Sequence, residues 1–118
     1  MLARSVTDSH EKIVGAIIVK NGNLLGAYAK PKVPLPQQGK LTELILQAEL
    51  VLSISKRNTN IFGDVNYAMI QHSILNIFLF PLDQHGTLAF AVEGRAGIDY
   101  DHERMITSIL KILPQFSN

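Results

Sequence analysis

The side chains best suited to chemistry in this sequence are its four histidines, His10, His72, His85 and His102. None lies three or four residues from another, which is the spacing that would place two of them on one helix face as metal ligands. His102-Glu103 resembles the start of a zinc-binding H-E-x-x-H motif, but Ile106 occupies the position of the second histidine. We therefore expect solvated or capping histidines and predict no metal site.

The other residue types that commonly act in catalysis are also absent or lie outside the sequence motifs in which they usually act. The chain has no cysteine, which removes thiolate nucleophiles, disulfides and cysteine-based metal sites together. Its serines lie in no G-x-S-x-G sequence, and its glycines form neither a phosphate-binding loop nor a G-x-G-x-x-G sequence. We predict no catalytic residues and no cofactor, and we expect a protein that is not an enzyme.

A group of acidic residues surrounds the predicted start of the last helix: Glu93, Asp99, Asp101 and Glu103. A cation or a basic partner is one interpretation of such a group. Acidic side chains at a helix N-terminus also compensate the helix dipole, and this accounts for most of them. Asp99 and Asp101 are both suitable N-cap residues.

Length and composition indicate one globular domain over residues 1–118. The chain is 47% hydrophobic and 18% charged, which excludes disorder and leaves apolar surface for a partner. The formal charge of +1 comes from basic and acidic residues that are interleaved along the chain, so we predict no nucleic-acid binding.

The longest apolar run, Ile74–Leu82, is far short of the roughly 20 residues that span a bilayer. Residues 1–12 lack the apolar segment of a signal peptide, and we expect a cytoplasmic protein without membrane contact.

The sequence elements begin with a predicted hairpin. Two apolar runs, Ile13–Val19 and Leu24–Ala29, are separated by Lys20-Asn21-Gly22-Asn23. Asn-Gly between such runs favours a tight hairpin, because both residues tolerate positive φ. Gly15 and Gly26 within the strands indicate bulges or close backbone contacts. For residues 1–12, a short helix and a loose arm both remain open.

Later segments alternate between helix and strand patterns. The prolines of Lys30–Lys40 predict a loop, because proline fits neither a helix interior nor a central strand. The remaining predicted elements are a helix over Leu41–Ser55, strands over Val65–Gln71, Leu75–Leu82 and Thr87–Glu93, and a helix from Asp99 or Asp101 to Leu113, where Pro114 ends it. The tight turn at Asp83–Gly86 would complete an antiparallel meander. Apolar residues on both faces of Leu75–Leu82 predict a strand that is covered on both sides. These elements define a small α+β domain.

The helix over Leu41–Ser55 has two apolar sides. At about 100° per residue, one broad face contains Leu41, Leu44, Ile45, Ala48, Val51 and Leu52, which should pack on the sheet. Leu46, Leu50 and Ile54 form a second stripe on roughly the opposite side. One sheet cannot cover both sides. We predict that the stripe, with the neighbouring Glu43 and Gln47, contacts a partner or a second copy, and burial by another element of the same chain is the alternative.

Several segments resemble one protein family: Val14–Leu25, Gly63–Met69, Phe80–Leu82 before Thr87–Val92, and Asp101–Ile106 before Ile109–Leu113. These are similar to the roadblock/dynein light-chain superfamily, and in particular to its short, uncharacterised archaeal members with a profilin-like fold. The resemblance covers about residues 10–113. It consists of apolar strands, turn glycines and helix positions, and it includes no catalytic motif.

The resemblance implies a fold and a function. It implies a five-stranded antiparallel sheet flanked by helices on both faces, in the order β-β-α-β-β-β-α. It also implies a homodimer that forms through the long helix and an edge strand to give one continuous sheet. Family members commonly bind and regulate small Ras-like GTPases or act as scaffold subunits, and they share no catalytic residues.

A second hypothesis is a sensory domain for a small molecule, because PAS-like and profilin-like sheets can enclose a ligand. Such a domain would need a pocket between sheet and helix, lined by residues such as Tyr28, Tyr67 and Phe90. The bulky apolar residues of the last three predicted strands favour a filled core instead.

Overall fold

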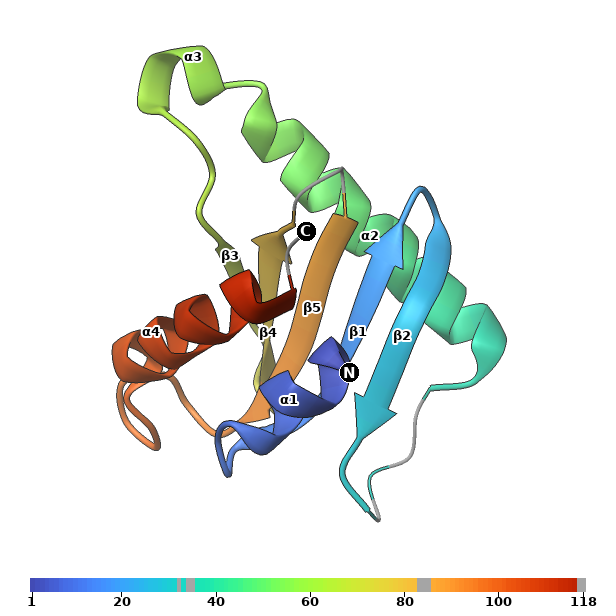
Figure 1. Cartoon of the computed structure of the whole chain (residues 1–118), viewed down its shortest axis with the longest axis vertical. Coiled ribbons are helices and arrows are strands. Elements are labelled where there is room, and N and C mark those ends of the chain that lie inside the picture. The colour runs from blue at the N-terminus through green and yellow to red at the C-terminus, as the bar shows by residue number, and fades with distance from the viewer. Residues whose placement is uncertain (32, 34–35, 83–85, 117–118) are drawn as a thin grey trace.

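The computed structural model describes residues 1–31, 33, 36–82 and 86–116 (Figure 1). Its elements are α1 (Leu2–Asp8), β1 (Ile13–Lys20), β2 (Asn23–Ala29), α2 (Gln38–Lys56), α3 (Thr59–Phe62), β3 (Ala68–Gln71), β4 (Leu75–Pro81), β5 (Gly86–Glu93), α4 (His102–Ile112) and the 3-10 helix η2 (Leu113–Phe116). The five strands form one antiparallel sheet in the order β2-β1-β5-β4-β3. This confirms the α+β class and the predicted five-stranded sheet. The N-terminal segment forms a short helix.

The β1–β2 hairpin turns at Asn21 and Gly22, as predicted. Their φ angles are +52° and +76°, the left-handed values that a tight hairpin turn requires. The Gly22 amide also donates a hydrogen bond to the Glu49 carboxylate at 2.9 Å, which ties the turn to α2. Both strand glycines lie next to bulges: the β1–β5 register shifts between Ile13 and Gly15, and the β1–β2 register shifts beside Gly26.

Replacing Gly22 with valine is expected to destabilise the fold by about 1–2 kcal/mol. A β-branched residue is strained at positive φ, and the turn offers no other conformation that keeps the hairpin register. Urea unfolding of the variant measures the loss. Asn23→Val is the matched control, because Asn23 is the first residue of β2 and is equally solvent-exposed. Equal stability of the two variants would contradict the left-handed turn.

The sheet is covered on both faces. Helices α1 and α4 pack on one face, where Phe78, Phe80 and Phe90 form the centre of the larger core. Helix α2 packs on the other face, where Leu52 and Leu79 belong to a smaller buried cluster. Alternate residues of β4 therefore enter different cores, which confirms that this strand is covered on both sides.

The start of α2, the length of β3 and the presence of α3 differ most from the prediction. Helix α2 begins at Gln38 and not at Leu41, because the prolines end at Pro36 and the Leu41 amide already donates to the Gln37 carbonyl oxygen at 2.8 Å. Strand β3 has four residues, since only Ala68–Gln71 pair with β4. The short helix α3 was not predicted. The predicted turn at residues 83–86, with His85, lies largely outside the described residues.

Helix α4 begins as predicted. The Asp101 carboxylate accepts a hydrogen bond from the Arg104 amide at 3.1 Å, so Asp101 is the N-cap. Helical spacing in the sequence predicts a buried stripe of Met105, Ile106, Ile109, Leu110 and Leu113. Met105 and Ile109 are buried, but Leu110 is 50% exposed, and its predicted place in the stripe was wrong. It lies about 100° around the helix from Ile109, outside the face that contacts the sheet. After Pro114 the chain continues as η2 and does not fray at once.

Candidate functional site

The predicted interaction stripe lies on the surface of α2. Leu46, Leu50 and Ile54 are 57%, 60% and 52% exposed, although each is a large apolar side chain. On the opposite side of the same helix, Ala48 and Leu52 are buried against the sheet. Within the part of the chain that the structure describes, no other element buries Leu46, Leu50 or Ile54.

The two polar residues predicted beside the stripe have different environments. Glu43 forms an ion pair with Lys40 at 2.9 Å, and both side chains are more than 60% exposed. Such a pair contributes little to stability and is free to exchange for another partner. Gln47 is also exposed, and it lies between the stripe and an apolar groove that runs beside α2. The stripe and the groove therefore form one continuous surface.

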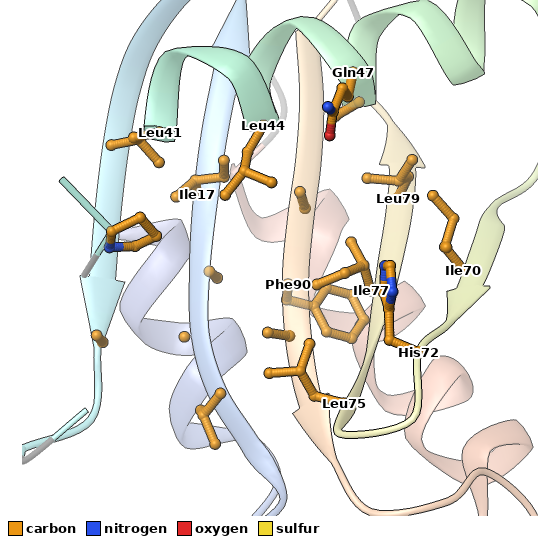
Figure 2. Close-up of a pocket in the computed structure, with 18 of the residues that line it drawn as sticks. Ile17, Leu41, Leu44, Gln47, Ile70, His72, Leu75, Ile77, Leu79 and Phe90 are labelled. Atoms are coloured by element: carbon orange, nitrogen blue, oxygen red, sulfur yellow. The ribbon is translucent and has the colours of Figure 1, made fainter. Parts of the chain in front are cut away.

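The groove has a volume of about 400 Å³ and lies between α2 and the uncovered part of the sheet (Figure 2). Leu41, Leu44 and Gln47 of α2 form one wall of it. Small residues form much of its floor: Gly15, Ala29, Ala89 and Ala91. Leu41 and Leu44 are only partly buried because they line this groove, whereas the sequence placed them fully on the sheet.

The groove is not lined by the residues that the hypothesis of a sensory domain named for its pocket. Of the three expected lining residues, only Phe90 lines it. Tyr28 packs against the core between the sheet and helices α1 and α4, and the Tyr67 ring stacks on Phe80 of that same core at a centroid distance of 5.6 Å. Both tyrosines therefore belong to the opposite face of the sheet from α2, and a ligand in the groove would not contact them.

Strand β3 forms an open edge of the sheet next to the groove. It is the last strand in the order β2-β1-β5-β4-β3, and among the described strands it pairs only with β4. Its Met69 and Ile70 side chains are 38% and 36% exposed. An edge strand with apolar side chains can accept a further strand through its unpaired backbone groups.

The three described histidines have different environments. His10 accepts a hydrogen bond from the Lys12 amide at 3.0 Å, and its ring lies edge-on to Tyr100. His72 lines the groove and His102 begins α4. In the part of the chain that the structure describes, no three histidine, aspartate or glutamate side chains come close enough together to hold a metal ion.

Two of the four acidic residues at the start of α4, Asp99 and Asp101, form hydrogen bonds within the fold. Besides the Asp101 cap, the Asp99 carboxylate accepts a hydrogen bond from the Arg95 amide at 2.7 Å and pairs with the Arg95 guanidinium at 3.3 Å. These hydrogen bonds, the backbone one first, lower the pKa of Asp99 below its usual value. They close the loop between β5 and α4.

The Asp99 contact predicts a pH dependence of stability. Because its pKa is lowered by folding, the stabilising contribution is present above the unfolded-state pKa of about 3.9 and is lost as pH falls through the folded value. Between pH 5 and pH 2, the free energy of unfolding should fall more steeply for the natural protein than for Asp99→Asn. Urea titrations at several pH values measure both slopes, and parallel slopes would contradict the assigned contact.

A set of exposed apolar side chains on either side of β3 was not predicted from the sequence. Ile61 and Phe62 of α3 are 69% and 80% exposed, and Ile74 of the β3–β4 turn is 82% exposed. The available signal was the apolar pair Ile61-Phe62 between Asn60 and Gly63, which was interpreted as part of the turn before the strand that begins at Val65. None of the described helices combines the length and the apolar character needed to cross a membrane.

Comparison with known proteins identifies the fold. No protein-family model matches the sequence, and no curated protein matches it. A roadblock/LC7 domain from Streptomyces avermitilis superposes with a TM-score of 0.75 at 11% identity, covering 97% of this chain and 90% of that one. MglB from Myxococcus xanthus gives 0.68 at 11% identity, over 98% and 94% of the two chains. A structure described as MglB with a tetrameric arrangement gives 0.63 at 11% identity, over 97% and 86%. The chain therefore has the roadblock/LC7 fold, as the resemblance implied.

Proposed function

We propose that this protein is a non-enzymatic interaction module of the cytoplasm that forms a homodimer and docks a partner protein. The observation that carries the proposal is the exposed stripe of Leu46, Leu50 and Ile54 on α2. Monomeric proteins rarely leave a line of large apolar side chains in water, and such surfaces mark contacts with other proteins. The description of one protein of this fold in a tetrameric arrangement also supports self-association.

The dimer uses α2 together with the edge strand β3. On the helix surface, Gln47 lies about 60° from Leu50 and about 60° from Leu44, so it joins the stripe to the groove. A second copy of α2 laid along this band would cover apolar residues of both. Antiparallel pairing of the two β3 edges would extend the sheet across both chains and remove the open edge.

A small Ras-like GTPase is the partner class that the family resemblance supplies. In the proposed dimer, the two α2 helices lie side by side on one face, and the outer part of each stripe, around Leu46, stays available. A pull-down from the native organism tests this, with the natural protein and Leu46→Asp as baits and GTP or GDP present. We expect the natural bait to capture a small GTPase in a way that depends on the nucleotide, and we expect the Leu46→Asp bait to lose it. Capture of other proteins only would contradict the GTPase assignment.

The groove supports a second candidate function, the binding of an apolar small molecule. Its volume of about 400 Å³ falls in the range of ligand pockets, and apolar residues dominate its lining. A thermal-shift screen with apolar metabolites tests this function. A stabilising compound whose effect is lost in Ala91→Leu, which narrows the groove, would support it. A screen with no stabilising compound would leave the interaction module as the function.

A further inference from the structure

The most exposed large apolar side chains of the protein cluster around one strand. Among the described residues, three of the four highest exposures are those of Ile74, Phe62 and Ile61, at 82%, 80% and 69%. Phe62 and Ile61 precede β3 in the chain, and Ile74 follows it directly. The edge strand is therefore flanked by uncovered apolar groups at both of its ends.

Helix α3 carries two of these groups away from the body of the domain. Figure 1 shows α3 beyond the end of the sheet, joined to β3 by an extended segment. Its backbone hydrogen bonds are local: the Phe62 amide donates to the Asn58 carbonyl at 2.9 Å, and the Gly63 amide donates to Thr59 at 2.8 Å. The chain then returns to the sheet at Val65, which packs on the cluster under α2. Helix α3 is a defined structure that presents apolar side chains outward.

We infer that α3 of each chain packs on the β3–β4 corner of a second copy, where the corner consists of His72, Ile74 and Leu75. This inference rests on the proposed homodimer. When two β3 strands pair antiparallel across a two-fold axis, the start of one strand lies beside the end of the other. If all four residues pair, Ala68 stands opposite Gln71, and the segment before β3 of one chain runs along the corner after β3 of the other.

The size of the interface favours a second copy as the occupant. A stable interface buries roughly 1,200–2,000 Å² in total. In the proposed dimer, a pair of four-residue β3 strands supplies only a small part of that area, so helix contacts from α2 and α3 must supply the rest. The α3 contact places Phe62 and Ile61 of one chain against the corner of His72, Ile74 and Leu75 of the other chain. Two-fold symmetry forms this contact twice. This contact covers the exposed apolar side chains before and after β3, because α3 of each chain covers the Ile74 corner of the other.

Cross-linking tests the contact directly, because the natural chain contains no cysteine. Cysteines are placed beside the contact so that Phe62 and Ile74 stay in place: Asn60→Cys protein is mixed with Ser73→Cys protein and treated with a short bis-maleimide. Both replaced residues are exposed. The expected product is a covalent dimer whose cross-linked peptide joins residue 60 of one chain to residue 73 of the other. Ile98→Cys is the control in place of Ser73→Cys, because Ile98 is 70% exposed but lies in the loop before α4.

If the natural protein is dimeric by light scattering but the cross-linking yield is no greater than that of the Ile98→Cys control, this inference is overturned and the proposed dimer stands. A natural protein that is monomeric at high micromolar concentration would overturn both.

As an independent measurement, Phe62→Ser should raise the dimer dissociation constant about 100-fold, because each of two symmetric contacts loses at least tenfold in affinity when phenylalanine burial is removed. Its urea midpoint, measured on the dissociated monomer, should be unchanged. An unchanged dissociation constant would overturn the inference.

Discussion

Replacement of Leu50 by aspartate is expected to turn the dimer into a monomer. Leu50 lies at the middle of the exposed stripe and is 60% exposed in the single chain. In the dimer its side chain would be covered, and a carboxylate there would lose its hydration without gaining a partner. The like charge of the second copy adds repulsion across the two-fold axis. We expect the dissociation constant to rise by at least about 100-fold, which corresponds to roughly 2.8 kcal/mol or more. Sedimentation velocity over a concentration series measures the change.

The matched control for this variant is Leu110→Asp. Leu110 is 50% exposed on α4, which covers the opposite face of the sheet, so the same charge is introduced on a helix outside the proposed interface. This control should dimerise like the natural protein. A dimer that survives Leu50→Asp, or one that Leu110→Asp disrupts equally, would show that the α2 stripe is not the contact surface.

The second large effect is expected in the core. Phe90→Ala should destabilise the fold by about 3–5 kcal/mol, because it removes a buried ring and leaves a cavity. The Phe90 ring is 2% exposed and stacks with Phe78 at 5.3 Å and with Phe80 at 5.6 Å between centroids. A loss of this size is a large part of the 5–15 kcal/mol that stabilises a typical domain. Urea unfolding followed by circular dichroism measures it.

Two controls separate the cavity from a loss of aromatic stacking. Phe90→Leu keeps most of the buried volume and should cost clearly less than the alanine variant. Tyr67→Ala removes a ring from the edge of the same stack, but Tyr67 is 39% exposed, so its loss should be the smallest of the three. If Phe90→Ala and Tyr67→Ala were equally destabilising, the central position of Phe90 in the core would be contradicted.

Much of the fold follows from local sequence signals. Asn21 and Gly22 define the hairpin because few other residue pairs adopt the left-handed turn that it requires. The double-sided apolar pattern of Leu75–Leu82 identified a strand between two layers, and Asp101 was one of two aspartates recognisable as candidate helix caps. The stripe of Leu46, Leu50 and Ile54 was visible because helical periodicity separates it from the residues that face the sheet.

Other features depend on tertiary structure that a local pattern does not specify. Val65–Gln71 alternates like a strand, yet only Ala68–Gln71 pair with β4, because the preceding residues leave the sheet to join α3. The groove arises from the position of α2 over the small residues of β1, β2 and β5, a position that no single segment determines. Tyr28 and Tyr67, which would line a pocket in a sensory domain, do not line the groove for the same reason. Tyr28 packs with the core under α1 and α4, and Tyr67 stacks on Phe80 of that core.

The molar mass of the natural protein in solution tests the central claim of self-association most directly. Multi-angle light scattering at high micromolar concentration should give about twice the chain mass of 13.1 kDa. A mass of one chain, unchanged across the concentration range, would contradict the dimer and remove the explanation of the exposed stripe on α2.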